Sequence, residues 1–181
     1  MKIKPLFLSL AMAGMCSQAM ANAIDQNSYA NLDDVVTTHL NLDLDVDFAD
    51  KQLEGFVEHT LKWNNDTSKK LVLDTRDLDI DKVMYQDTSG DWHKAKFTLA
   101  DRDDVKGSKL TITLKSQAPK VRIYYNSRPE ASGLQWLTPE QTASKTHPFM
   151  YSQSQAIHAR SWLPVQDTPA MRVTYSARIH T

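Results

Sequence analysis

Cysteine is almost absent from this sequence, since Cys16 is the one cysteine in 181 residues. It lies in an N-terminal stretch that we expect to be removed. The mature chain therefore has no disulfide and depends on its hydrophobic core, which a domain of this size can supply. Excess positive charge is missing too: 21 Lys and Arg face 22 Asp and Glu, which argues against a nucleic-acid partner. Glycine and proline number only 5 and 7, which excludes a fibrous or low-complexity chain.

The beginning of the chain has the pattern of a secretory signal peptide. Two lysines precede an apolar run at 6–15 that is too short to span a bilayer, and small residues suited to cleavage follow, including Ala21 and Ala23. We therefore expect residues 1–23 to be a signal peptide and the protein to be exported, periplasmic or secreted, without a membrane span. Residues 24–181 then make one domain of ordinary size.

Alternation of apolar and polar residues dominates the sequence up to about residue 128. In "HLNLDLDVDF" (residues 39–48) leucines, valine and phenylalanine share one face and aspartates share the other, which predicts a half-buried strand. "FVEHTLKWNN" (residues 56–65) alternates in the same way, and the short polar connection between the two runs predicts an antiparallel pair. Similar runs occupy residues 69–86, 94–100, 109–115, 120–127 and 171–179. No helical period precedes residue 130, so the predicted fold class is all-β, a sandwich or curved multi-sheet domain.

Two regions depart from this alternation. Residues 22–33 are polar and predict a flexible arm. Residues 129–170 are interrupted by prolines, yet they contain Trp136 and Trp162, which need burial, so we expect an ordered excursion with short strands. No turn or capping signal precedes Thr181, which leads us to expect that the domain is truncated there.

Metal-binding patterns are weak in this sequence. Asp43, Asp45, Asp47 and Glu54 have the first, third, fifth and twelfth positions of a calcium loop, but Phe48 stands where the sharp turn needs glycine. The strand interpretation of these residues is therefore favoured. None of the six histidines forms a His-Glu-x-x-His motif, and no Gly-x-Ser-x-Gly occurs. The residues of this chain alone predict neither a metal site nor a catalytic site.

Three motifs near the end are more specific than strand alternation. They are "QWLTP" (residues 135–139), "SQSQA" (residues 152–156) and "PVQDTP" (residues 164–169). With the earlier runs "LDLDVDF", "LEGFVEHTLKW" and "LVLDTRDLDIDKV", they resemble the N-terminal domain of the aminopeptidase N / leukotriene hydrolase family of zinc metallopeptidases. Within that family the sequence is similar to the leukotriene hydrolase-type branch. The resemblance runs from about Asp34 to the end of the chain.

The resemblance implies a saddle-like, multi-sheet β domain that leans on a catalytic zinc domain. It also implies that Gln153, Ser154 and Gln155 border the substrate site, with the two glutamines facing the amino end of a peptide substrate. The family's Gly-x-Met-Glu-Asn and His-Glu-x-x-His motifs follow this domain and do not occur in this sequence. We therefore expect catalytic residues and zinc in the full-length parent enzyme, and neither in this chain alone. The implied activity is removal of N-terminal residues from peptides.

Alternatives remain at this point. Without the resemblance, Gln153 and Gln155 fit an ordinary exposed strand face. Arg160 lies between the glutamine motif and Trp162, and we expect it to be a structural hydrogen-bond or ion-pair hub rather than a surface charge. The stretch 167–169 is turn chemistry in either interpretation. The rival function from another class is a free-standing periplasmic β-sandwich module for binding or assembly.

Overall fold

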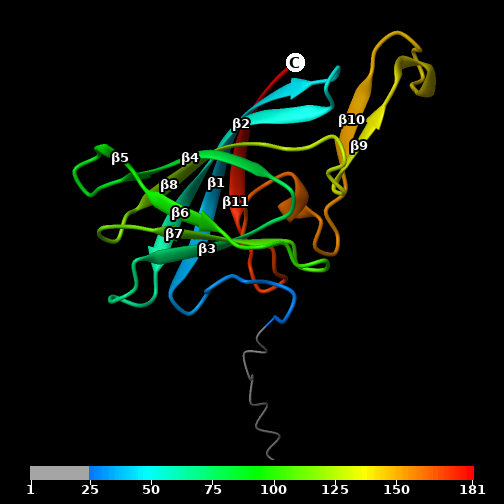
Figure 1. Cartoon of the computed structure of the whole chain (residues 1–181). Coiled ribbons are helices and arrows are strands. Elements are labelled where there is room, and N and C mark those ends of the chain that lie inside the picture. The colour runs from blue at the N-terminus through cyan, green and yellow to red at the C-terminus, as the bar shows by residue number, and fades with distance from the viewer. Residues whose placement is uncertain (1–24) are drawn as a thin grey trace, which may run out of the picture.

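Eleven strands and two short 3-10 helices make up residues 25–181, the part of the chain that the computed structural model describes (Figure 1). The predicted signal peptide lies outside these residues. The strands are β1 (Val35–Asp47), β2 (Gln52–Trp63), β3 (Lys70–Thr75), β4 (Asp79–Gln86), β5 (Trp92–Lys94), β6 (Lys96–Leu99), β7 (Ser108–Thr113), β8 (Lys120–Asn126), β9 (Leu134–Leu137), β10 (Phe149–Ser152) and β11 (Thr174–His180). The 3-10 helices are η1 (Pro139–Gln141) and η2 (Ala159–Ser161). The prediction of an all-β fold with several sheets is confirmed.

The largest sheet has six strands in the order β11-β1-β2-β8-β4-β5. Strands β1 and β2 pair antiparallel, as their alternation and short connection predict. Leu40, Leu42 and Leu44 are at most 5% exposed, so the leucine face of β1 is the core face. The acidic face lies opposite, where Asp43 accepts hydrogen bonds from Arg178 and His180 of β11. The strand interpretation of the calcium-like spacing is therefore confirmed.

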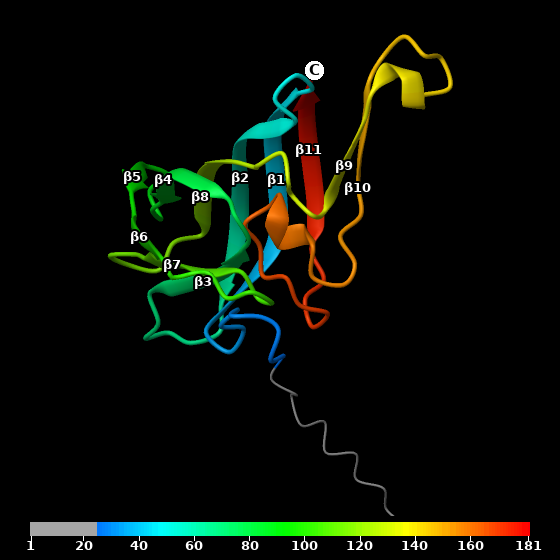
Figure 2. The same cartoon turned by 45° about the vertical axis from the view of Figure 1, so that its right-hand side comes forward.

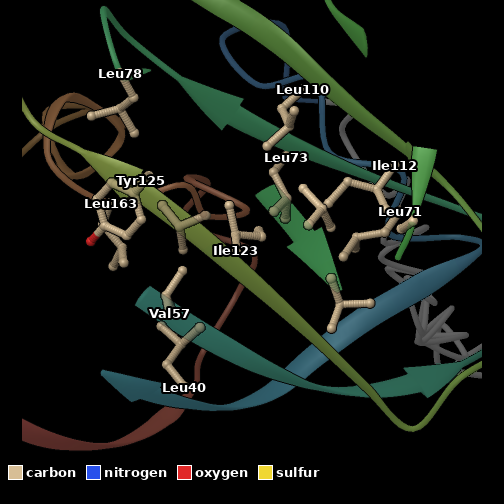
Figure 3. Close-up of a cluster of buried hydrophobic side chains, with 14 of the residues drawn as sticks. Leu40, Val57, Leu71, Leu73, Leu78, Leu110, Ile112, Ile123, Tyr125 and Leu163 are labelled. Atoms are coloured by element: carbon tan, nitrogen blue, oxygen red, sulfur yellow. The ribbon is translucent and has the colours of Figure 1, made fainter. Parts of the chain in front are cut away.

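A second, three-stranded sheet has the order β3-β7-β6 and packs its leucines against the large sheet. Leu71 and Leu73 of β3 meet Val57 and Ile123 of the large sheet in a buried cluster (Figure 3). The sequence shows one long alternating run over residues 69–86, but the chain changes sheet within it. The residues between β3 and β4 make that change, and Asp77 takes a positive φ of 56° there.

The third sheet is the two-stranded hairpin of β9 and β10, which projects from the rest of the molecule (Figures 1 and 2). Its inner face is held by Trp136, whose ring meets that of Phe48 edge to face with centroids 5.7 Å apart. The proline-rich region thus contains short ordered strands, as expected from its tryptophans. The hairpin carries the chain directly into the glutamine motif.

The N-terminal segment differs from the flexible arm that its polar sequence predicts. The side chain of Asn31 donates to the backbone oxygen of Lys70 and accepts from the backbone N–H of Val72, both at 2.9 Å. The backbone N–H of Tyr29 donates to Asp74 at 2.7 Å. Polar side chains thus bind this segment along β3, a pairing that composition alone does not reveal.

Candidate functional site

The glutamine motif follows the last residue of β10 without a break in the hairpin hydrogen bonding. The backbone N–H of Gln153 donates to the oxygen of Gly133 at 2.9 Å, which extends the β9–β10 ladder by one pair. The chain then turns, and the N–H of His158 donates to the oxygen of Ser154 at 2.9 Å. Gln153 and Gln155 are exposed, and Ser154 is half-buried.

Ser154 anchors the segment between the two glutamines. Its Oγ accepts a hydrogen bond from the indole Nε1–H of Trp162 at 3.1 Å, so the serine side chain points inward. The side chains of Gln153 and Gln155 on either side of it are exposed. The side-chain oxygen of Gln153 also accepts from the backbone N–H of Gln155 at 3.2 Å, which ties the two glutamines together.

Gly133 allows the hairpin to approach the turn closely. A Cβ at this position would lie 2.5 Å from the backbone oxygen of His158 and 2.8 Å from Cδ1 of Trp162. The backbone N–H of Gly133 donates to Oγ of Ser161 at 2.8 Å. The glutamine-bearing turn is therefore packed against the hairpin on one side and against η2 on the other.

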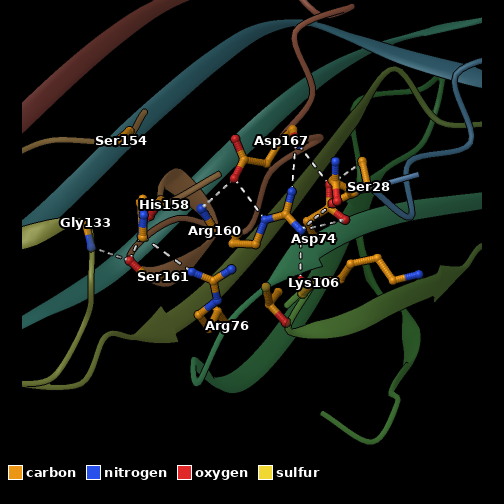
Figure 4. Close-up of polar contacts among 12 residues, drawn as sticks. Ser28, Asp74, Arg76, Lys106, Gly133, Ser154, His158, Arg160, Ser161 and Asp167 are labelled. Atoms are coloured by element: carbon orange, nitrogen blue, oxygen red, sulfur yellow. Dashed lines mark hydrogen bonds and ion pairs between the residues drawn. The ribbon is translucent and has the colours of Figure 1, made fainter. Parts of the chain in front are cut away.

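Arg160 is the buried hub that the sequence predicts (Figure 4). Its Nε donates to the carboxylate of Asp167 at 2.9 Å, and its NH2 donates to the backbone oxygen of the same residue at 2.8 Å. The NH1 group donates to the backbone oxygens of Asn27 and Lys106, both at 2.8 Å. One fully buried guanidinium thus joins three segments that are far apart in the sequence.

Asp74 is the second buried charge at this hub, and sequence reasoning missed it. Its carboxylate accepts from the Ser28 hydroxyl at 2.6 Å, from the N–H of Tyr29 at 2.7 Å and from the N–H of Asp167 at 3.0 Å. Arg160 NH1 lies 3.8 Å away. Burial raises the pKa of Asp74, and these partners oppose the shift. The one indication in the sequence was that an acidic residue stands near the end of a buried strand.

Gln166 and His59 attach the end of the motif to the large sheet. Gln166 accepts from the N–H of Thr37 and donates to the oxygen of Val35, each at 2.9 Å, as a neighbouring strand would. His59 is fully buried, and its Nε2–H donates to the oxygen of Pro164 at 3.1 Å, while its Nδ1 accepts from the Thr37 hydroxyl at 3.0 Å. Burial lowers the pKa of His59 to about 4, so the ring is neutral.

The hairpin continues an outward face beside the glutamines. Tyr151 stands opposite Gln135 in the β9–β10 register, and its hydroxyl hydrogen-bonds to the side-chain oxygen of Gln135. Phe149, two residues earlier, is 54% exposed. The face thus combines neutral amides with aromatic rings, which can orient an uncharged or ammonium-bearing group.

The residues that the structure describes do not fit a zinc site. Within residues 25–181, no group of three or more His, Cys, Asp or Glu side chains is placed to hold a metal ion. In the same range no helix is long and apolar enough to span a bilayer.

This geometry defines the class of protein. It is a multi-sheet β domain in which a hairpin leads into a glutamine motif that packs against the hairpin. Residues 36–181 match the family model described as the Peptidase M1 N-terminal domain. The chain therefore belongs to this family, and the resemblance read from its motifs is confirmed.

Curated relatives and solved structures agree with this assignment. The chain is 41% identical over 160 residues to leucine aminopeptidase 2 of Yarrowia lipolytica and 37% identical over 160 residues to leukotriene A-4 hydrolase of Xenopus laevis. These alignments cover 87% and 86% of this chain but 24% and 26% of the relatives. The structure of yeast LTA4 hydrolase with bestatin matches with a TM-score of 0.79 and 33% identity, over 89% of this chain and 25% of that one. The chain thus spans about a quarter of the length of these proteins.

Proposed function

We propose that this chain is the substrate-bordering N-terminal domain of an exported zinc aminopeptidase that removes N-terminal residues from peptides. The observation that carries the proposal is the pair of exposed amides, Gln153 and Gln155, on a turn braced by Ser154 and Trp162. The names of the relatives, an aminopeptidase and a hydrolase, support the reaction class.

The chemistry of the two amides suits the amino end of a peptide. A glutamine oxygen accepts a hydrogen bond from an α-ammonium group, and its NH2 donates to a substrate carbonyl. Two such groups orient the amino end without adding charge, so a carboxylate elsewhere is free to complete the ammonium site. Zinc is implied by the family resemblance and would be held outside residues 25–181.

We propose that the exposed apolar face of β11 and the hairpin contacts the rest of the parent enzyme. Tyr175 and Ile179 pair with Leu40 and Leu44 of β1, so they lie on the core face of the sheet. They are nevertheless 73% and 51% exposed. A core face without a cover favours contact with another part of the same protein, and the relatives are about four times as long.

Export is supported by the signal-peptide pattern of residues 1–23. Mass determination of the N-terminus of the protein recovered from its native cells tests this part of the proposal. A mature chain that begins at residues 22–24 is expected, and a chain that retains Met1 or Lys2 contradicts export through this segment.

The substrate role is tested by mutating the glutamines in the full-length enzyme that contains this domain. Each of Gln153→Ala and Gln155→Ala removes groups that pair with a bound substrate, which costs about 1–3 kcal/mol, or a roughly ten- to hundredfold fall in kcat/KM on an aminoacyl substrate. We expect the larger effect at Gln155, because the family resemblance places it nearer the substrate amine.

A matched control is Gln86→Ala on β4, where the glutamine side chain bonds to the oxygen of Gly90. This variant is expected to keep the parent rate. Zinc content and melting temperature are measured for all three variants. Folded, zinc-loaded Gln153→Ala and Gln155→Ala enzymes that hydrolyse substrate at the parent rate would contradict the proposed role.

A further inference from the structure

A cavity of about 550 Å³ opens between three loops and η2, and neither Gln153 nor Gln155 lines it. Arginines come from each loop: Arg76 follows β3, Arg102 lies between β6 and β7, and Arg128 follows β8. A volume of this size falls in the range that small organic ligands occupy. The three guanidinium groups are not equivalent, because they have different hydrogen-bond and ion-pair partners.

The two outer arginines are neutralised by carboxylates. Arg102 donates from Nε to Asp77 and from NH1 to Asp104, each at 3.0 Å. Arg128 donates to Asp79 at 2.7 Å. These pairs are exposed and leave little net charge at the rim of the cavity, which the exposed carboxylate of Glu130 also lines.

Arg76 has no such partner. Its NH2 donates to the backbone oxygen of Val105 at 2.6 Å, and its NH1 donates to the Ser132 hydroxyl at 3.3 Å. No carboxylate of residues 25–181 forms an ion pair with it, and its Nε is buried with no acceptor in that range. A guanidinium offers five N–H donors, so this group has donors to spare.

Electrostatics around Arg76 also leave room for a negative charge. Burial, followed by the cations of Arg160 and Arg102, lowers the pKa of Arg76 and outweighs the opposite effect of Asp167 and Asp77. An anion beside the guanidinium would relieve both effects, because it compensates the lost solvation and screens the neighbouring cations.

Two further polar groups adjoin Arg76. The Ser132 hydroxyl lies 2.7 Å from Nδ1 of His158, and NH1 of Arg76 lies 3.5 Å from the same nitrogen. In Figure 4 the guanidinium of Arg76 is turned toward His158. The guanidinium can donate to the oxygens of a carboxylate or phosphate, and the hydroxyl and the imidazole lie beside it at the same wall.

We propose that this cavity binds a small organic anion whose carboxylate or phosphate group pairs with Arg76, beside Ser132 and His158. The inference is independent of the proposed peptidase role of the glutamines. Arg76 supplies the positive charge and the planar guanidinium group. Arg102 and Arg128, which are paired with carboxylates, lie at the rim of the cavity.

The test follows the arginine Nε–H signals of the full chain by ¹⁵N NMR, during titration with sodium phosphate or sodium acetate at constant ionic strength set by sodium chloride. The Arg76 signal is identified as the one missing in Arg76→Lys. We expect it to shift saturably with at least one of the two oxyanions and not with chloride. Saturation with phosphate alone points to a phosphate-bearing ligand, and saturation with acetate points to a carboxylate.

Variants separate this site from general anion effects. In Arg76→Gln, the dissociation constant read from the ring signals of His158 is expected to rise about tenfold or more, because charge-assisted hydrogen bonds are lost. Arg178→Gln, which removes an exposed arginine paired with Asp43, is expected to leave it unchanged. Circular dichroism shows whether Arg76→Gln is folded. If it is not, the titration of the Arg76 Nε–H signal in the unmutated protein tests the proposal by itself. Equal, unsaturated drift with all three salts, or saturation that survives in folded Arg76→Gln, overturns the proposal.

Discussion

Trp162 donates the hydrogen bond that turns Ser154 inward, from indole Nε1 to Oγ at 3.1 Å. The neighbouring Gln153 and Gln155 are both exposed, whereas the serine between them is half-buried. The indole is itself held against Gly133 of the hairpin. A tryptophan two positions after Arg160 thus connects the glutamine motif to the buried hub.

Loss of the Ser154 hydroxyl should weaken this connection. In Ser154→Ala the indole N–H loses its acceptor, and we expect the free energy of unfolding to fall by about 1 kcal/mol. Urea denaturation measures the change. Ser89→Ala, in the exposed turn before β5, serves as the control and should change stability by less than about 0.5 kcal/mol. An unaltered midpoint for Ser154→Ala would mean that the contact does not stabilise the turn.

Arg160→Met should be far more damaging. The substitution keeps much of the side-chain volume but leaves the carboxylate of Asp167 and the backbone oxygens of Asn27 and Lys106 without their donor. Breaking a buried ion pair from one side costs about 3–5 kcal/mol. The same denaturation experiment measures it, with Arg178→Met as the control, since that arginine is 73% exposed and its ion pair contributes little. A loss below about 1 kcal/mol would show that Arg160 is not the hub.

Stability should depend on pH through His59. Its pKa is about 4 in the fold and 6.5 in the unfolded chain. The unfolded chain therefore binds the extra proton between these values, and stability falls as the pH drops from 6.5 to 4. The contribution is on the order of 3 kcal/mol across the window.

A matched variant isolates that contribution from the carboxyl groups. His59→Gln has no titrating ring, so its free energy of unfolding should change less steeply than that of the unmutated chain over the same window. Both are measured by urea denaturation at several pH values. Parallel curves would contradict a neutral, buried His59.

The exposed apolar residues of β11 should make the isolated chain associate. Tyr175 and Ile179 lie on the core face of the large sheet and remain accessible. We expect the double variant Tyr175→Ser, Ile179→Ser to bind less hydrophobic dye and to elute as a smaller species at high concentration. A double substitution of Thr174 and Ser176 by alanine, on the opposite face of the strand, is the control. Identical dye binding by all three proteins would mean that this face is not an adhesive surface.

The sequence by itself determined which residues of β1 face the core. Alternation has a period of two, which is a local property, so the buried leucines of β1 and the all-β class follow from it directly. Family-specific motifs were equally readable, because they are contiguous. The hub role of Arg160 was predicted from its immediate neighbours, although its partners were not.

Only the tertiary structure decided the contacts between distant segments. Alternation does not state which strand pairs with which. The apolar positions of residues 69–86 change parity between Leu73 and Leu78, but a change of parity does not say that the chain moves to another sheet. Glu58 belongs to the polar face of β2 by alternation, yet Lys120 and Arg122 of β8 bond to its carboxylate and leave it 5% exposed. Asp74 meets Ser28 and Arg160 for the same reason: hydrogen bonds and ion pairs act over a few ångströms, and only folding brings such groups from remote parts of the chain within that range.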